Sequence, residues 1–159
     1  MSLVNCSTST LKESDTSVEG EVPVYGASGI SGYVNEPMET QDSILITKDG
    51  SGVGTIRYVR EKHSFVGTLA SLTAKEGVYL PYVYFVLMNF SFSSYKTGLA
   101  IPHIYFKDYG KALIPCPTYE EQMKIATGLM KILERLTAEN KMVDKLLIQK
   151  RYLQNMLFI

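Results

Sequence analysis

One uninterrupted helical pattern over 118–159 constrains this chain more than any other feature of its 159 residues. Thr118 is followed three residues later by Glu121, a spacing typical of a capping box at a helix N-terminus. No proline follows Pro117, and Gly128 is the only later glycine. Apolar residues then recur at helical spacing, at Ile125, Leu129, Ile132, Leu133, Leu136, Val143, Leu146, Leu147, Leu153 and Leu157. The pattern predicts a helix of roughly 35–40 residues, about 55 Å long at 1.5 Å per residue.

Such a helix is too long for one small domain to cover. Globular helices average about 11–12 residues, so the distal part must bury its apolar face against another helix. A heptad pattern can be assigned along it, and the interface positions are Leu129, Leu133, Leu136, Asn140, Val143 and Leu147. An asparagine in a core position sets the register and the number of helices at some cost in stability. We therefore expect a homodimer through this helix; packing along its own domain is the alternative.

The preceding segment, 1–117, shows short apolar runs bounded by glycines, the pattern of a β-rich domain. Asp49-Gly50 is a turn signal and predicts a β-hairpin over 44–59. The expected strands are 22–25, 43–47, 53–59, 65–69, 71–73 and a last one at 111–115. The fold class predicted is therefore α+β, with a mixed, β-rich domain over 1–117 and the long helix over 118–159.

Two segments of this domain are less clear. The run from Leu80 to Met88 is predicted to be a helix because Pro81 suits a first helical turn. A strand remains the alternative there, since the run is rich in aromatic and β-branched residues. The first twenty residues are rich in Ser and Thr and lack hydrophobic periodicity, which predicts a loop.

The charge of the chain sums to zero but is unevenly distributed. The first 47 residues carry seven acids and one base, whereas residues 48–118 carry eight bases and four acids. The basic middle segment is compatible with an anionic partner, although ordinary solvated charges explain it as well. The apolar runs are too short to span a membrane, and Cys6 and Cys116 show no metal-ligand or disulfide spacing. We expect a cytoplasmic protein.

No arrangement of residues typical of catalysis is found. The two histidines, His63 and His103, lie far apart and belong to no metal-ligand pattern. The glycines of 26–32 have the spacing G-x-x-G-x-x-G, which is not that of a dinucleotide loop. Cys116 lies between two prolines with no base indicated nearby. We expect no catalytic residues, no metal site and no enzyme activity.

Polar, basic and aromatic residues in predicted loops are the candidates for DNA binding. Lys and Arg neutralise phosphate, and hydroxyl and imidazole groups hydrogen-bond to phosphate or base edges. The candidates are Tyr25, Ser28, Lys48, Ser51, Arg57, Lys62, Lys96, Thr97 and His103. This signal is unspecific, and for each residue an ordinary surface position is the alternative.

Four phrases in order along the chain resemble those of specificity subunits of type I restriction-modification systems. VPVYGASGISGY at 22–33 resembles the family's IPVYGGNGIIGY, and ILITKDGSGVG at 44–54 is similar to ILIGRKGSVG. TGLAIPHI at 97–104 resembles TGSAIPNL, and IPCPTYEEQMKIA at 114–126 is similar to IPLPPLEEQKKIA. Each phrase is weak alone, but their shared order is specific.

The resemblance implies that 1–117 is a target-recognition domain for double-stranded DNA that reads about half of a split site. The long helix would act as a spacer and a seat for the modification subunits, with the restriction subunit a further partner. Methyltransferase chemistry and S-adenosylmethionine would belong to the modification subunit, and this chain would hold no cofactor. The setting implied is the cytoplasm of a bacterium or archaeon.

The chain also departs from the family pattern. A full specificity subunit carries two recognition domains and two long helices, whereas this chain has one of each, as expected of a half-subunit or a fragment. The DNA-contacting side chains vary among family members, so none is carried over from the resemblance. The alternative function is an assembly adaptor on the same scaffold without DNA specificity of its own.

Overall fold

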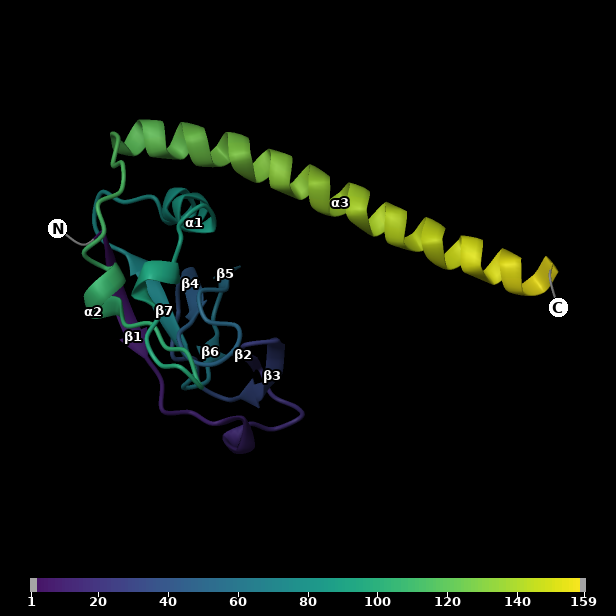
Figure 1. Ribbon diagram of the computed structural model, residues 1–159, viewed down its shortest axis with the longest axis horizontal. Coiled ribbons are helices and arrows are strands. Elements are labelled where there is room, and N and C mark those ends of the chain that lie inside the picture. The colour runs from purple at the N-terminus through teal and green to yellow at the C-terminus, as the bar shows by residue number, and fades with distance from the viewer. Residues whose placement is uncertain (1–2, 158–159) are drawn as a thin grey trace.

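Two small sheets and a long projecting helix make up the computed structural model, which describes residues 3–157 (Figure 1). The first sheet is antiparallel, with the order β1-β7-β4-β5. Its strands are β1 (Val4–Thr8), β7 (Leu69–Ala74), β4 (Ser43–Thr47) and β5 (Ile56–Val59). The second sheet has the order β3-β2-β6, from β3 (Gly29–Val34), β2 (Val22–Gly26) and β6 (Ser64–Phe65). The predicted α+β class is confirmed.

The core lies on both faces of the first sheet, and β4 shows why. Ile44 and Ile46 point into one apolar cluster together with Val83 and Leu87 of α1 (Leu80–Met88). Leu45 points the other way, into a cluster with residues of the second sheet. A central strand buried on both faces needs a continuous apolar run rather than alternation, which is the pattern of 43–47.

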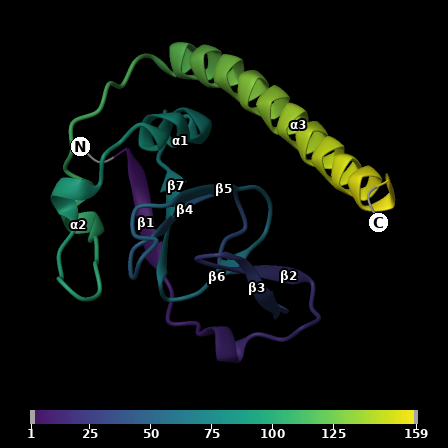
Figure 2. The same cartoon turned by 45° about the vertical axis from the view of Figure 1, so that its right-hand side comes forward.

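Helix α1 forms as predicted and covers one face of the first sheet (Figures 1 and 2). Pro81 sits in its first turn, where the missing N–H costs no hydrogen bond. The connection from α1 to the long helix contains a 3-10 turn, η2 (Ser93–Tyr95), and the short α2 (Phe106–Tyr109). A further 3-10 turn, η1 (Glu13–Asp15), precedes β2.

The predicted long helix is confirmed as α3 (Tyr119–Leu157), and its capping box forms. The Thr118 N–H donates to Glu121 Oε2 at 3.0 Å, and the Glu121 N–H donates to Thr118 Oγ1 at 3.4 Å. These bonds lower the pKa of the Glu121 carboxyl, because they favour its charged form. The last residues of the predicted helical segment, 158–159, and the first two of the chain lie outside the described part.

Among the described residues of α3, only those up to Leu133 pack on the rest of the chain. Gln122 and Ala126 are buried where α3 crosses α1, and the helix then leaves the domain (Figure 1). Every residue from Glu134 to Leu157 is exposed. The alternative of a helix packed along its own domain is therefore wrong for the distal part of α3.

Three sequence predictions about the domain are wrong. The expected strand 65–69 is a turn between β6, which ends at Phe65, and β7, which begins at Leu69. The first twenty residues are not only loop, because Val4–Thr8 pairs with β7 as an edge strand that exposes most of its residues. Polar Ser and Thr suit such an exposed edge, which hid the strand from a search for hydrophobic alternation. The predicted strand 111–115 is an extended connection with no strand partner, and Leu113 is 98% exposed.

The hairpin of β4 and β5 is confirmed with a shorter second strand. β5 begins at Ile56 rather than at Val53, because residues 50–55 form successive turns. The Val53 N–H donates to Gly50 O at 3.1 Å, and the Thr55 N–H donates to Gly52 O at 3.0 Å. Gly50 and Gly54 both have positive φ, a conformation that glycine adopts without strain.

Candidate nucleic-acid interface

Two loops that are distant in sequence lie paired at one end of the first sheet. One is the β4–β5 connection, 48–55, and the other is 96–104, between η2 and α2. The Gly50 N–H donates to Pro102 O at 3.0 Å, and the Ile104 N–H donates to Lys48 O at 3.0 Å. We call these two segments the paired loops. They lie on the far side of the domain from α3 (Figures 1 and 2).

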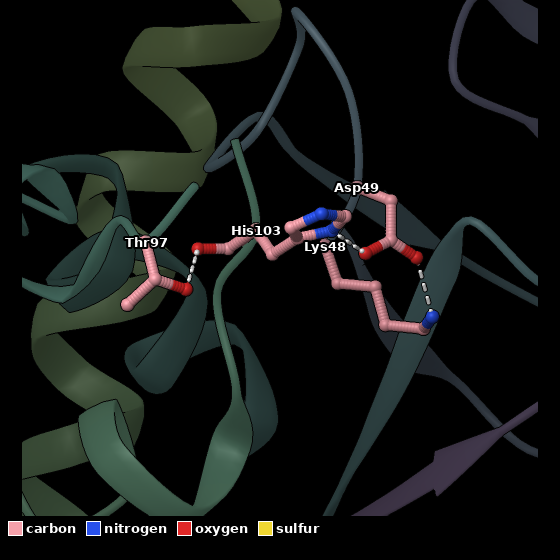
Figure 3. Close-up of polar contacts among 4 residues, drawn as sticks. All are labelled: Lys48, Asp49, Thr97 and His103. Carbon is pink, nitrogen blue, oxygen red and sulfur yellow. Dashed lines mark hydrogen bonds and ion pairs between the residues drawn. The ribbon is translucent and has the colours of Figure 1, made fainter. Parts of the chain in front are cut away.

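An Asp49 carboxylate joins the paired loops through their side chains (Figure 3). Its Oδ1 lies 2.7 Å from His103 Nδ1, and its Oδ2 accepts from Lys48 Nζ at 2.6 Å. Because a carboxylate only accepts, Nδ1 of His103 must carry the proton in this contact. Partial burial raises the pKa of Asp49, but the bonds from Lys48 and His103 outweigh it and lower that pKa overall.

The second loop is itself a tight turn closed by Thr97 and His103. Their backbones exchange two hydrogen bonds, of 2.9 and 2.8 Å, and Thr97 Oγ1 donates to His103 O at 3.4 Å. Gly98 has a φ of 86°, and a Cβ there would collide with the carbonyl of Ile101. The turn leaves Leu99 and Ile101 exposed at its tip. The exposed side chains of Ser51 and Lys96 lie on the same two loops.

Tyr25 and Arg57 form a second group, which links the two sheets. The Arg57 guanidinium carbon lies 5.5 Å from the centroid of the Tyr25 ring, a cation–π distance. Ser28 is exposed in the turn between β2 and β3. Lys62 is exposed in the loop before β6. The structure thus brings Lys48, Ser51, Lys96, Thr97 and His103 onto the paired loops, and DNA contact by any candidate stays a prediction.

His63 is a core residue rather than a surface ligand. It is fully buried, with Nδ1 2.9 Å from Glu61 O and Nε2 2.7 Å from Ser43 Oγ. The carbonyl can only accept, so Nδ1 carries the proton and the Ser43 hydroxyl donates to Nε2. Both ring nitrogens of His63 are therefore occupied by hydrogen bonds to Glu61 and to Ser43 at the start of β4.

The predicted interface residues of α3 do not share one environment. Leu129, Leu136, Asn140, Val143 and Leu147 are exposed. Leu133 is half-buried and lines a hollow with Tyr25, Tyr58, Tyr84 and Met130 of its own chain. The face that carries Leu133 is thus turned toward the domain, and the dimer interface itself stays a prediction.

Sequence reasoning missed two residues that organise these surfaces. Asp49 was read only as a turn residue, but its carboxylate ties Lys48 to His103. Gln122 is 1% exposed and accepts from the Tyr79 N–H at 2.9 Å, while its Nε2 donates to Pro117 O at 2.9 Å. Its position one residue after the Glu121 cap placed it in a first helical turn, but nothing in the sequence indicated its burial.

Residues 3–157 give little support for a metal site, a membrane-spanning helix or a nucleophilic Cys6 thiol. That part of the chain contains no group of three His, Cys, Asp or Glu side chains placed to hold a metal ion. None of its helices has both the length and the apolar character needed to cross a membrane. Burial raises the pKa of the Cys6 thiol to about 11, which makes this thiol a poor nucleophile.

Comparison with known proteins gives one family and several structural relatives. Residues 3–146 match the family described as "Type I restriction modification DNA specificity domain". No curated protein matches the sequence. The S subunit of a type I restriction-modification system from M. genitalium has a TM-score of 0.75 and 23% identity, over 100% of this chain and 45% of that one.

Two further solved structures have the same fold. One, from work on complex assembly and conformational transition of the type I R-M system, has a TM-score of 0.74 and 17% identity, over 96% of this chain and 41% of that one. The HsdS subunit from Thermoanaerobacter tengcongensis has a TM-score of 0.62 and 18% identity, over 86% and 36%. The chain spans less than half the length of each.

The family match covers most of the chain, including the two sheets, the paired loops and the greater part of α3. The family is the DNA-recognition component of its restriction-modification complex and not the catalytic one. The four sequence phrases and the match agree, and the chain belongs to the type I restriction-modification DNA specificity domain family.

Proposed function

We propose that this chain reads one half of a bipartite DNA site for a type I restriction-modification complex. The observation that carries the proposal is the joining of 48–55 and 96–104 into one exposed surface on the side away from α3. DNA recognition and assembly would then use opposite sides of the molecule. The setting we expect is the cytoplasm of a bacterium or archaeon.

The paired loops offer the groups that DNA recognition uses. Lys96, Ser51 and Thr97 are exposed there, and His103 is held with a defined ring orientation by Asp49. Cations and hydroxyls bind phosphate oxygens, whereas a fixed imidazole can hydrogen-bond to a base edge. Positive-φ glycines in both loops let the backbone turn tightly beside a ligand.

Electrostatics supports a modest affinity for the isolated chain. The net charge is zero, and the Lys48 ammonium is already paired with Asp49. Sequence-independent attraction to DNA depends on unneutralised cations, so much of it would come from other subunits. We therefore expect specific recognition in the assembled complex rather than tight binding by the chain alone.

Assembly is assigned to the helical side of the molecule. We propose that the modification subunits dock on α3 and that a second copy pairs along its exposed apolar residues. A helix with a long exposed apolar face needs a partner, and the solved relative studied for complex assembly has the same fold. S-adenosylmethionine would be bound by the modification subunit, with the restriction subunit as a further partner.

The decisive experiment is a footprint of the complex reconstituted with its modification subunit and S-adenosylmethionine. We expect protection of a defined bipartite sequence, with an affinity that falls steeply with salt. Sequence-indifferent binding by a properly assembled complex would overturn the proposal. It would favour the second candidate, an assembly adaptor, which the zero net charge and the uncovered helix also suit.

A further inference from the structure

The tip of the second paired loop is apolar although it faces solvent. Residues 99–101 read Leu-Ala-Ile, and all three are exposed. Leu99 is fully exposed and Ile101 is more than half exposed, whereas tight turns are usually built from polar residues, glycine and proline. Leu99 also stands where the family phrase TGSAIPNL has serine, so leucine is a feature of this chain rather than of the phrase. A ligand explains this apolar tip better than folding does.

The tip is held rigidly at its base. The backbones of Thr97 and His103 exchange two hydrogen bonds, of 2.9 and 2.8 Å. The Gly50 N–H on the other loop donates to Pro102 O at 3.0 Å. Ile104, which follows directly, is 1% exposed and belongs to the core. Because the base of the turn is fixed before any ligand binds, the tip is presented without the entropic cost of ordering a loop.

Cations flank the apolar tip on both sides along the chain. Lys96 is exposed directly before the turn, and Lys107 is exposed after it. The Lys107 ammonium lies 5.2 Å from the centroid of the Tyr105 ring, and this ring stacks on His103 with 6.5 Å between centroids. An apolar tip with cations behind it is complementary to a polymer that is anionic outside and apolar inside. Duplex DNA has this arrangement, with phosphates outside and stacked bases inside.

Apolar side chains act on DNA in two main ways. They contact thymine methyl groups in the major groove, or they enter between base pairs from the minor groove and kink the duplex. Leu, Ile and Pro are among the side chains that act as such wedges, and 99–102 contains one of each. A single narrow turn fits the minor groove, which is about 6 Å wide and distinguishes few base pairs by hydrogen bonding. An apolar side chain therefore loses little recognition there.

We propose that Leu99, supported by Ile101, inserts as a wedge between two base pairs of the recognised half-site from the minor groove and kinks the duplex there. Lys96 and Lys107 would hold phosphates beside the opened step. Flexible pyrimidine–purine steps unstack most easily, so the wedge favours such a step at its position. This inference rests on the proposed function and adds the residue that deforms the DNA and the kind of base step that it selects.

Leu99→Ser in the full chain, assembled with its modification subunit and S-adenosylmethionine, tests the wedge. The side chain is fully exposed, so the variant should keep its Tm. Binding to the recognised site should weaken by about 10-fold, because the burial of a leucine is lost, whereas binding to unrelated DNA should not change. Leu113→Ser is the matched control, since Leu113 is an exposed leucine outside the paired loops. This control should bind the site as the wild type does.

Fluorescence of 2-aminopurine locates the opened step. The probe replaces adenines of the half-site one at a time on either strand, and it brightens where stacking is lost. We expect a position that is bright with the wild-type complex and dim with Leu99→Ser. Methyltransferases also turn out their target base, and that position should stay bright with both. An abasic site at the opened step removes the cost of unstacking, so it should tighten wild-type binding and leave Leu99→Ser nearly unchanged.

Uracil in place of the thymines of the half-site tests the major-groove alternative. Uracil lacks the methyl group, so a wedge predicts unchanged wild-type binding. Three outcomes would overturn the wedge while leaving half-site recognition intact: Leu99→Ser binding as tightly as the wild type, no position that dims in that variant, or uracil DNA that reproduces its loss of affinity. A wild-type complex with no sequence-specific footprint would overturn the proposed function itself.

Discussion

Gln122 offers the sharpest test of how α3 is fixed to the recognition domain. Its side chain is buried at the crossing of α3 and α1 and bridges two backbone groups from different segments. The Tyr79 N–H at the start of α1 needs an acceptor, and the carbonyl of Pro117 needs a donor. The Gln122 amide supplies both at once, which also fixes the orientation of this side chain.

The expected cost of Gln122→Ala follows from those two bonds. Each buried group left without a partner costs about 1–3 kcal/mol, and both Tyr79 and Pro117 are half-buried, so water can reach them in part. We expect a loss of about 2–4 kcal/mol in the free energy of unfolding. For a chain of this size, that corresponds to a fall in Tm of about 5–15 °C.

Calorimetry and far-UV circular dichroism during heating measure this loss, with Gln149→Ala as the matched control. Gln149 is exposed on the distal part of α3, so its loss should change stability by less than about 0.5 kcal/mol. A Gln122→Ala chain as stable as the control would show that the two Gln122 hydrogen bonds do not stabilise the attachment of α3 to the domain.

Gln122→Glu adds a pH signature to the same argument. The new carboxyl still accepts from Tyr79, but its ionised form cannot donate to Pro117 and is buried. Burial would raise its folded-state pKa above the unfolded value, so the variant should be closest to wild type at acid pH and lose stability as pH rises through that pKa. An equal deficit at all pH values would contradict this reasoning.

Three further predictions concern the paired loops and the helix. Asp49→Asn should cost about 1 kcal/mol at neutral pH, since charged hydrogen bonds across the loops are lost. The pKa of Asp49 is lowered in the folded chain, so the difference in free energy of unfolding between wild type and variant should fade as pH falls below about 3.8. Urea unfolding at several pH values measures this difference, and a difference that does not change with pH would argue against the role of Asp49. Lys96→Ala should reduce the slope of log K against log salt by about 0.9 for DNA binding by the complex. Lys141→Ala on α3 is its control, and equal slopes for both would show that Lys96 makes no phosphate contact. Duplication of 140–146 lengthens α3 by one heptad, which should move two recognition domains joined through this helix about 10 Å further apart and widen the spacer of the bipartite site by about three base pairs. An unchanged spacer in a methylation assay would contradict a spacing role for α3.

The sequence predicted the elements whose signals are local. The capping box and the absence of helix breakers defined the start of α3, and Pro81 correctly favoured a helix over a strand at 80–88. The sequence did not predict β1, because its Ser and Thr residues lie at a sheet edge, where burial imposes no alternation of apolar and polar residues. The stretch 111–115 was mistaken for a strand because apolar residues beside prolines look the same whether or not a partner strand exists.

The candidate site was predictable only in part, because its organisation is tertiary. Lys48 and His103 were chosen separately, but no local pattern indicates that Asp49 joins loops about fifty residues apart in sequence. Helix α3 illustrates the same limit. Leu133 and Ile132 are equally apolar neighbours, and only the packing of α3 on α1 decides that Leu133 faces the domain and Ile132 faces away.

The anchor of α3 on its domain and the length of the helix would together set the geometry of the proposed dimer. Gln122 and Ala126 fix the direction in which the helix leaves its domain, and the length of α3 beyond them would set how far apart two recognition domains lie. Beyond Ala126, α3 is a continuous helix without proline and with Gly128 as its one glycine, so it transmits spacing as a rigid rod. Loss of the Gln122 hydrogen bonds would then loosen the angle between recognition domains, whereas changing the length of α3 would alter the distance between them. These are separable effects on a split DNA site, because angle sets whether both halves can be bound at once and distance sets the length of the spacer.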